Sequence, residues 1–496
     1  MQLKFKDAVN YFKFGDLEKS KKICEEIFIS EKDNIDFIYF YAHVLYSKKE
    51  FNTAIDLWNK VIDLNPNHKE SLNGKGNALK RLEKYDLAIE CFEKALKAEP
   101  KFFDAYYNLA NVYLKLSNFE KSITNFKKAY NLNPNFIKAL QGIGYSLMKN
   151  LEYENALEYF YECLNKGDKN SEIYNYIGIC LNKIGKYEES IEYYSESLKL
   201  NPNNLNSIDN LLNLLTYHNP KKEHKNFIIK INQKLKRIDF KFDLDQKIDD
   251  KEVVHLLNKI FTVSTSYTVL NELELDQIFR RNKIDLNCER HFKVFNSYNV
   301  IPEFCFGCYK IQINPKNILD LIKLYIIFDQ FEFGADVFRK TLIEVRPKIP
   351  GTYKGLIYCS NKNEANIILE KILPVLKENL GNDLSIGIKR GCSEFAISFP
   401  GYEKLDSDLK FNPQWKDKEN IIDSKEKNKE RAILENSIMG LNIFDAIVLR
   451  NWLIYAKMID DISYKNFDTD IKDTGHMNKI LSHQQNFRKK EFNKLS

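Results

Sequence analysis

Two adjacent segments of equal length decide the fold of the N-terminal part of the chain. They are residues 67–100, NHKESLNGKGNALKRLEKYDLAIECFEKALKAEP, and residues 101–134, KFFDAYYNLANVYLKLSNFEKSITNFKKAYNLNP. Each is 34 residues long and ends in a proline, which stops a helix because it has no backbone N–H to donate. A repeat of this period predicts stacked helical hairpins, in which each hairpin buries its apolar face against its neighbours.

The same register extends in both directions along the chain. Helix-ending pairs recur at Asn65-Pro66, Glu99-Pro100, Asn133-Pro134 and Asn201-Pro202. A small residue and then an aromatic residue precede each proline at fixed positions: Ala54 and Trp58, Ala88 and Phe92, Ser122 and Phe126, and Ser190 and Tyr194. The first helix of each unit has its own small residue, which is Ala42, Gly76, Ala110, Gly144 or Gly178. Small residues beside large ones predict a close approach of the two helices of each hairpin.

These residues resemble the tetratricopeptide repeat (TPR) family over about residues 1–202. The first unit, residues 1–34, is atypical, with Ser20 and Cys24 at the small and aromatic positions, as expected of a terminal cap. Residues 205–217 are expected to begin a seventh unit, and residues 227–238 to complete or cap it. The resemblance implies an N-terminal all-α superhelix of six to seven hairpins over residues 1–238.

The resemblance also implies a concave groove, lined by the first helix of each hairpin, that binds an extended peptide. On that wall it places Asn73, Asn77, Lys80, Arg81, Asn108, Asn111, Lys115, Gln141, Lys149, Asn175, Asn182, Lys183, Asn210 and Asn213. An amide side chain can pair with a peptide backbone whatever the peptide's side chains are, and the interleaved lysines and arginine favour an acidic ligand. The alternative is that these asparagines only pack or solvate the helix face.

The 34-residue register is lost after about Asp239. Helices are expected at residues 251–262 and 269–281. They are followed by a strand at 304–313, a helix at 317–331, strands at 341–346 and 355–359, a helix at 364–379 and a strand at 384–389, with a further short strand at 395–399. The order strand, helix, strand, strand, helix, strand is that of the ferredoxin-like arrangement. We therefore predict an α+β domain of this kind over residues 239–402.

Cysteine and basic residues are expected to gather at one end of that sheet. They are Cys305, Cys308, Arg346, Lys389, Arg390 and Cys392, with Cys288 available from the preceding segment. The four thiols of Cys288, Cys305, Cys308 and Cys392 form the donor set of a tetrahedral zinc site or an iron–sulfur cluster. Cys359 is expected at the far end of the sheet, away from this group.

Two other interpretations of the same residues stay open. Neighbouring arginine and lysine side chains can lower the pKa of a thiol and so produce a redox-active or nucleophilic cysteine. In the simpler interpretation the cysteines only fill the edge of the sheet, and Arg346, Lys389 and Arg390 are solvated or bind an anion.

Residues 403–431 are charged and have little periodicity, which indicates a linker. Residues 432–496 are expected to form a helical tail, with apolar helices at 432–439 and 442–458. A helix that is apolar on several faces must be buried. These helices would dock on the sheet, on the repeats or on a second protomer, so self-association is one of the expectations.

Composition narrows the class of function. The net charge of +6 is small for 496 residues and argues against nucleic acid as a partner. The longest apolar stretch is interrupted by charges and is too short for a membrane span, and nine cysteines without a secretory signal favour a cytoplasmic location. No phosphate-binding glycine loop or H-E-x-x-H motif occurs. We therefore expect a non-enzymatic scaffold or adaptor that binds a peptide segment of a partner protein. The alternative is a TPR-fused enzyme that acts on a polypeptide through the cysteine site.

Overall fold

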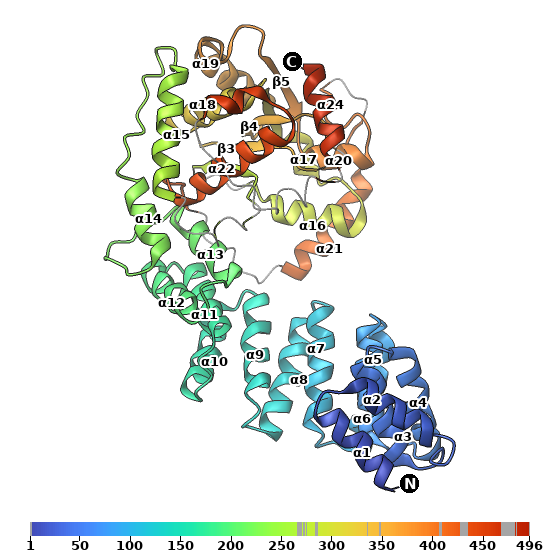
Figure 1. Cartoon of the computed structure of the whole chain (residues 1–496). Helices are drawn as coiled ribbons and strands as arrows, with labels where there is room; N and C mark the ends of the chain where they lie inside the picture. The colour runs from blue at the N-terminus through green and yellow to red at the C-terminus, as the bar shows by residue number, and fades with distance from the viewer. Residues whose placement is uncertain are drawn as a thin grey trace. The chain divides into compact units, whose positions relative to one another are not determined.

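The chain divides into two compact units in the computed structural model, Met1–Ile184 and Gly185–Ser496, and Figure 1 labels most of their helices and some of their strands. The structure describes residues 2–264, 270, 273, 275–282, 286–334, 336–346, 349–405, 409–426, 435–467, 482 and 484–495. The second unit begins inside the repeats. The division of the chain into four parts at residues 238, 402 and 431 stays a prediction.

The first unit consists of helical hairpins. Its helices are α1 (Gln2–Lys13), α2 (Leu17–Ile27), α3 (Ile35–Ser47), α4 (Phe51–Leu64), α5 (Lys69–Arg81), α6 (Tyr85–Ala98), α7 (Phe103–Lys115), α8 (Phe119–Leu132), α9 (Ile137–Lys149), α10 (Tyr153–Asn165) and α11 (Ser171–Lys183). The residue before each periodic proline, such as Asn65 or Glu99, caps the C-terminus of its helix. The predicted helix ends are confirmed.

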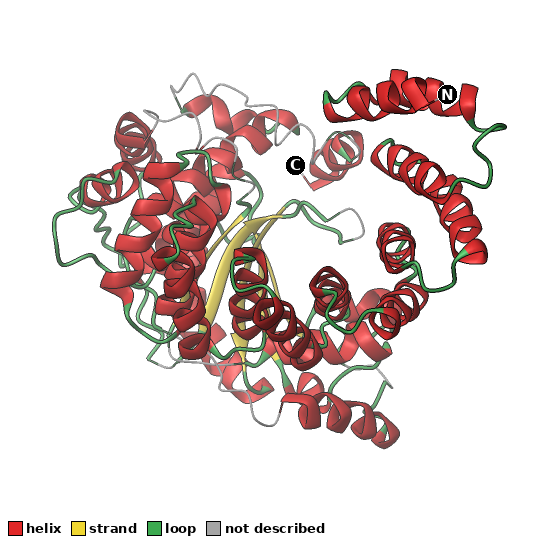
Figure 2. Cartoon of the chain, turned by 90° about the horizontal axis from the view of Figure 1, so that it is seen from below, coloured by secondary structure: helices red, strands yellow, loops and turns green. Residues whose placement is uncertain are grey.

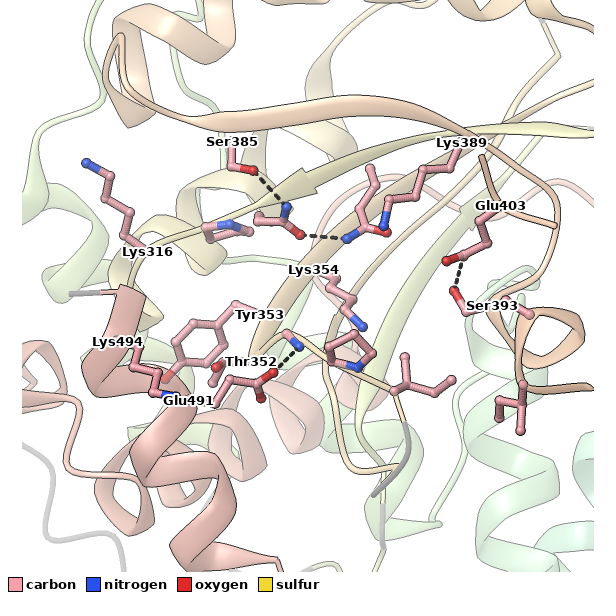
Figure 3. A pocket seen from close by; sticks show the side chains of 18 of the residues that line it. Lys316, Thr352, Tyr353, Lys354, Ser385, Lys389, Ser393, Glu403, Glu491 and Lys494 are labelled. Carbon is pink, nitrogen blue, oxygen red and sulfur yellow. Dashed lines mark hydrogen bonds between the residues drawn. The ribbon is translucent and has the colours of Figure 1, made fainter. Parts of the chain in front are cut away.

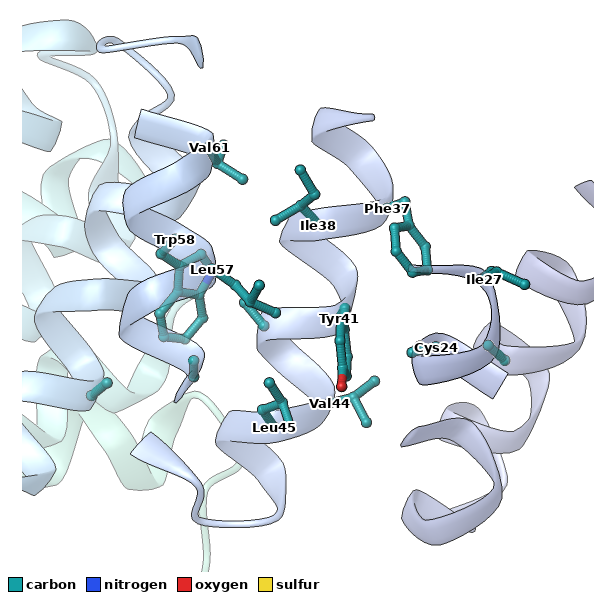
Figure 4. Packing of buried hydrophobic residues seen from close by; sticks show 14 residues of the cluster. Cys24, Ile27, Phe37, Ile38, Tyr41, Val44, Leu45, Leu57, Trp58 and Val61 are labelled. Carbon is teal, nitrogen blue, oxygen red and sulfur yellow. The ribbon is translucent and has the colours of Figure 1, made fainter. Parts of the chain in front are cut away.

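Small residues on the first helices allow aromatic rings of the second helices to lie against the backbone. A Cβ atom placed on Gly76 would lie 2.6 Å from the ring of Phe92, and one placed on Gly144 would lie 2.8 Å from the ring of Phe160. Trp58 uses Gly74 of the following hairpin in the same way. Figure 4 shows the buried hydrophobic cluster of the first hairpins, to which Trp58 belongs. The expected pairing of small with large residues is confirmed.

A left-handed residue recurs in the turn of each hairpin, in the same 34-residue register. The residues with positive φ at these turns are Gly15, Lys49, Glu83, Ser117, Leu151 and Gly185. Only the first and last are glycine, although glycine adopts this conformation at the lowest cost. The four central turns therefore hold a non-glycine residue in a strained conformation.

The stack is curved toward its first helices. Each of α1, α3, α5, α7 and α9 contacts the next first helix, whereas the second helices of successive hairpins approach one another less closely across residues 2–184. In a curved stack the inner helices lie closest together. The first helices of this unit therefore line the inner wall.

The second unit combines the last repeat helices with a small antiparallel sheet. Its longer helices are α12 (Tyr187–Leu200), α13 (Leu205–Leu215), α14 (Phe227–Leu235), α15 (Asp250–Ser264), α16 (Cys288–Tyr298), α18 (Ile318–Gln330), α19 (Lys362–Leu380), α21 (Lys416–Glu426), α22 (Ile443–Met458) and α24 (Gln485–Leu495). The shorter ones are α17 (Glu303–Gly307), α20 (Ser393–Ser398), η2 (Pro413–Trp415) and η3 (Ile462–Asn466). The helical repeats and the sheet-containing region agree with the predicted fold class at this level.

Five strands form one sheet in the order β1-β3-β4-β2-β5, in which each pair of neighbours is antiparallel. The strands are β1 (Gln277–Arg281), β2 (Tyr309–Asn314), β3 (Phe338–Ile343), β4 (Tyr353–Cys359) and β5 (Ser385–Arg390). They appear together in Figure 2. Helix α18 covers one face of the sheet, because a Cβ atom on Gly355 of β4 would meet Leu324 and Phe328. The opposite face carries Lys310, Gln312 and Lys354.

A buried ion network joins the edge strand to two helices. Arg280 of β1 donates to Asp445 of α22 (Nη2 to Oδ2, 2.7 Å) and to Asp329 of α18 (Nε to Oδ1, 2.5 Å). Tyr325 donates its hydroxyl to Asp445 at 3.0 Å. All four side chains are buried, and Asp445 is fully enclosed. Helix α22 is thus held inside its own unit, where it contacts α13, α14, α15 and α18.

Several predicted elements take a different form. Residues 277–281, expected at the end of a helix, form β1, and most of residues 265–274 lie outside the described part of the chain. The predicted strand 304–313 begins with α17, and residues 395–398 of the predicted strand 395–399 belong to α20. In the expected linker, α21 packs on α16, and Arg290 forms ion pairs with its Glu419 and Asp423. Of these elements, β1 depends on long-range pairing with β3, which no local pattern reports.

The expected helix at residues 432–439 is also absent where the chain is described. Residues 435–439 are not helical, and 432–434 lie outside the described residues. Among the described helices, none is both long enough and apolar enough to cross a membrane.

Candidate functional site

The predicted groove residues all lie on first helices of the repeats. In the first unit, α5, α7, α9 and α11 carry Asn73, Asn77, Lys80, Arg81, Asn108, Asn111, Lys115, Gln141, Lys149, Asn175, Asn182 and Lys183. Asn210 and Asn213 are on α13 of the second unit. The predicted row in the first unit therefore lies on the helices that line the inner wall.

Two amides link neighbouring first helices. Asn108 of α7 donates Nδ2 to Oδ1 of Asn73 on α5 at 2.9 Å. Within the described part of the chain, the amino group of Asn73 and the carbonyl oxygen of Asn108 make no further hydrogen bond, and both side chains are half-buried. Asn111 instead donates to the backbone oxygen of Tyr107 at 2.8 Å, four residues earlier on its own helix. The row therefore combines amides that face the neighbouring repeat with amides that bond back to the helix.

Other members of the row differ in burial and charge. Burial lowers the pKa of Lys80 to about 8, and the neighbouring charge of Arg81 adds to this effect. Gln141 donates to Asp168, Asn175 is buried, and Lys115 is exposed. The polar side chains of the wall therefore range from buried to exposed. Whether they bind a peptide stays a prediction.

The four predicted metal-ligating cysteines meet at one small cavity of the second unit. Cys288 begins α16, Cys305 lies in α17, Cys308 follows it, and Cys392 caps the N-terminus of α20. The cavity is completed by His291, by Tyr358 of β4 and by the neighbouring residues Leu286, Phe292, Phe304, Gly391 and Phe395. Three separate segments therefore bring the four thiols together. In the part of the chain that the structure describes, however, no group of three or more His, Cys, Asp or Glu side chains is arranged to hold a metal ion.

Burial disfavours the charged form of the thiols of Cys305, Cys308 and Cys392. Burial raises the pKa of Cys308 and of Cys392 to about 12, and proximity to the other cysteines adds to the effect, although Lys310 acts in the opposite direction. The pKa of Cys305 is raised for the same reasons. At Cys308 and Cys392 the effect of burial on the thiol pKa is larger than the opposite effect of Lys310.

Cys359 lies at the same end of the sheet as Cys308, and not at the far end as predicted. The antiparallel register of β2 and β4 places Cys359 opposite Tyr309, which directly follows Cys308. Side chains alternate between the two faces of a strand, so Cys359 faces away from its neighbour Tyr358, which lines the cysteine cavity. Cys359 does not line the cysteine cavity, as predicted, but the reason is that its side chain lies on the other face of the sheet.

The three residues predicted to bind an anion do not form one site. Arg346 is neutralised by Glu344 (Nε to Oε1, 2.7 Å) and also pairs with Glu394. Arg346 follows β3, whose last residue, Ile343, pairs with Tyr353 at the start of β4. Cys308 lies near the other end of β4, so Arg346 and Cys308 are at opposite ends of the sheet. The guanidinium of Arg390 stacks on the ring of Phe306. Arg390 and Lys389 are adjacent in β5, so their side chains lie on opposite faces of the sheet. Of the three, only Lys389 lines the cavity described next.

Sequence reasoning missed a cavity of about 760 Å³ on the face of the sheet that α18 does not cover. Figure 3 shows its lining side chains. The floor is formed by side chains of three adjacent strands, namely Gln312, Asn314, Lys354, Ser385 and Lys389. The alternation of polar with apolar residues in β2 and β5 was a signal for a polar face, but the loops and helices that wall the cavity come from distant parts of the chain.

A buried lysine bonds to two residues that line this cavity. Lys310 donates to Glu403 and to Ser393, each at 2.7 Å, and both acceptors line the larger cavity. Ser393 directly follows Cys392 in the sequence. Hydrogen bonds from Lys310 and Ser393, with the positive charge of Lys310, hold the pKa of Glu403 below its ordinary value although burial opposes this.

Comparison with protein families identifies the repeats. The family described as "TPR repeat" matches residues 76–117, and "Tetratricopeptide repeat" matches residues 103–136 and 171–204. "Anaphase-promoting complex, cyclosome, subunit 3" matches residues 18–95. No family matches the region after the repeats. No curated protein matches the chain.

Solved structures similar to the chain include several repeat proteins. YrrB, described as a TPR protein with an unusual peptide-binding site, is 22% identical, and the match covers 38% of this chain and 96% of YrrB with a TM-score of 0.34. MamA from Desulfovibrio magneticus RS-1 is 26% identical over 34% of this chain and 94% of MamA, with a TM-score of 0.31. PilW, a type IV pilus biogenesis factor, is 19% identical over 43% of this chain and 98% of PilW, with a TM-score of 0.39. On the family matches and the repeated residues, residues 18–204 are a segment of tetratricopeptide repeats.

Proposed function

We propose that the chain is a protein-interaction scaffold whose repeat segment binds an extended segment of a partner polypeptide. The repeats support a protein-interaction role as a class. The observation that carries the specific proposal is the row of amide and basic side chains along the helices of the inner wall. A peptide in that groove would find donors and acceptors for its backbone at Asn73, Asn77 and Asn108.

The charge of the wall favours an acidic segment. Lys115 and Lys149 are exposed and Lys80 is half-buried, so the three differ in how readily they reach a ligand. A carboxylate close to Lys80 would favour its charged form and would reverse part of the effect of burial on its pKa. We therefore expect acidic peptides to bind more tightly than neutral peptides, and the preference to weaken as salt screens the charges.

The full chain can be tested against an array of extended 15-residue peptides of varied charge. Replacing Asn108 and Asn111 by Ala together should weaken capture of the peptides that the wild type binds, by roughly tenfold for one or two lost hydrogen bonds. Replacing Thr124, which is exposed on the second helix α8, and the half-buried Asn125 beside it by Ala is the matched control and should leave capture unchanged. Equal loss in both variants, or no loss in the first, contradicts the amide-row proposal.

As a second function we propose metal binding by Cys288, Cys305, Cys308 and Cys392. The observation in its favour is that four thiols from three segments line one cavity. Binding of Zn²⁺ or of an iron–sulfur cluster would require the thiols to lose their protons and to draw closer together. In the alternative of a TPR-fused enzyme, this site would act on a polypeptide held by the repeats.

Metal analysis of the purified full chain tests this second proposal. We expect about one bound metal ion or cluster per chain, and its loss in the double variant Cys305→Ser and Cys308→Ser. Cys91→Ser, which changes a buried repeat cysteine, is the matched control and should keep the metal. A wild-type protein without metal, together with unchanged stability of the double variant, rules out the metal site.

We further propose that β2-α18-β3-β4-α19-β5 is a ferredoxin-like unit to which β1 has been added. This succession of elements and the antiparallel order β3-β4-β2-β5 support the proposal. Deleting β1 would then leave a complete four-stranded sheet, although the ion pairs of Arg280 would be lost with it.

A further inference from the structure

The cavity on the face of the sheet has the size and composition of a small-molecule site. Its volume of about 760 Å³ falls within the range of ligand pockets, which is roughly 300–1,000 Å³. Its walls come from the loop around Gly351, from α20 and from α24, which are far apart in the sequence. A site assembled in this way depends on the complete second unit.

Most of the charges around the cavity are already paired. Lys354 donates to Glu344 (Nζ to Oε2, 2.8 Å), and Lys316 pairs with Asp383. Glu491 accepts from Arg488 and from the backbone N–H of Gly351, each at 2.7 Å. These interactions neutralise every carboxylate of the lining, including Glu403, which is held by Lys310.

Two lysines of the lining have no acidic partner among the described residues. Among the described residues, neither Lys389 nor Lys494 has a hydrogen bond or ion pair, and Figure 3 shows them on different sides of the cavity. Glu403 is close enough to Lys389 for their charges to interact, but its Oε1 already accepts from Lys310 and Ser393. The excess charge of the cavity is therefore positive.

The floor of the cavity has room for a ligand above β5. Gly387 lies opposite Gln312 in the register of β2 and β5, so both occupy the same face. A Cβ atom placed on Gly387 would have no heavy atom within 4 Å. The polar groups of Gln312, Asn314 and Ser385 surround this open floor.

One wall is apolar. Ile349, Pro350, Ala396 and Ile397 line the cavity, and 49% of Ile397 is exposed. Covering such a side chain with the apolar part of a ligand is favourable. Thr352, which also lines the cavity, is 3% exposed and its hydroxyl has no partner among the described residues. A ligand that reaches this edge would supply one.

We propose that this cavity binds a small amphipathic anion, with its carboxylate or phosphate group at Lys389 and its apolar body against Ile397. Lys389 supplies the charge, and Gln312 and Ser385 orient the polar end of the ligand. The apolar body distinguishes this ligand from a free inorganic ion. The proposal is independent of peptide binding by the repeats and of metal binding by the cysteines.

Calorimetric titration of the full chain with four probes tests the proposal. The probes are hexanoate, monohexyl phosphate, the neutral isostere hexanamide and inorganic phosphate. We expect at least one of the two hexyl anions to bind, hexanamide to bind at least tenfold more weakly than that anion, and inorganic phosphate to bind more weakly than monohexyl phosphate. The ratio of hexanoate to monohexyl phosphate affinity then shows which anionic group the site prefers.

Three variants locate the site. Lys389→Gln should weaken binding of the preferred anion by roughly tenfold to a hundredfold, because a hydrogen bond to a charged group is lost. Gly387→Leu should abolish binding while leaving the fold intact, because its side chain enters open space above the floor. Lys377→Gln, which removes an exposed lysine from α19, is the matched control and should bind as the wild type does.

Thermal unfolding of each variant separates a lost site from a lost fold. An unchanged Tm with lost binding in Gly387→Leu or Lys389→Gln supports the proposal. Equal affinity for hexanoate and hexanamide, absence of binding by both hexyl anions, or full affinity in both cavity variants overturns it.

Discussion

The contacts that stabilise each unit of the chain join residues at very different separations in the sequence. In the repeats, the buried contacts join neighbours, as when Phe92 packs on Gly76 within one hairpin. In the second unit, Arg280 bonds to Asp445, 165 residues away. The difference teaches that a change in a hairpin should be felt locally, whereas a change in the ion network should be felt by the whole second unit.

The largest effect is expected from Arg280→Met. It leaves Asp329 and Asp445 buried without their cation, which typically costs about 3–5 kcal/mol of folding free energy. Hydrogen exchange followed by mass spectrometry should show lost protection throughout residues 185–495 and unchanged protection in residues 2–170. Arg81→Met, at an exposed position of α5, is the control. Loss of protection confined to β1 would contradict the idea that the network ties the unit together.

A smaller and more local effect is expected from Gly76→Val. The new side chain would collide with the ring of Phe92, and overpacking of this kind costs typically about 1–3 kcal/mol. Loss of protection should centre on α5 and α6. Adding Phe92→Leu to the variant should restore part of the stability, since it makes room for the new side chain. If the double variant loses more folding free energy than the two single variants lose together, the close approach of the ring is not the reason for glycine at position 76.

The smallest effect has the opposite sign. Leu151 holds a φ of 67° in the turn between α9 and α10, where glycine would carry no penalty. Leu151→Gly should therefore stabilise the repeats by about 0.5–1 kcal/mol, after the added flexibility of the unfolded chain is taken into account. Leu151→Ala keeps the strain and should not stabilise. Thermal unfolding of the three proteins decides between a strained turn and a relaxed one.

The repeats could be predicted from the sequence because their determinants are local. Gly76 and Phe92 lie within one 34-residue unit, as do Gly144 and Phe160. The prolines after Asn65 and Glu99 mark helix ends that are visible in the local sequence. The left-handed turns escaped prediction, since Lys49, Glu83 and Leu151 are not residues that favour positive φ. Their 34-residue spacing was nevertheless present in the sequence.

The second unit was predictable only where its elements are regular. The strand and helix order from β2 to β5 followed from alternation and turn residues, whereas β1 depends on pairing with β3, more than fifty residues later. The grouping of the four cysteines could be proposed from topology. The sheet-face cavity could not, because α24 and the loop at Gly351 meet only in the folded chain, where Glu491 accepts from the backbone of Gly351.

Site-specific photocrosslinking of the full chain tests the role of the inner wall most directly. A photoreactive amino acid replaces either Lys115, exposed on the first helix α7, or Lys94, exposed on the second helix α6, and the protein is irradiated with an acidic peptide that it captures from the array. We predict a crosslink from position 115 that excess unlabelled peptide suppresses, and little or none from position 94. Crosslinks of equal yield from both positions, or from position 94 alone, would contradict the inner wall as the binding surface.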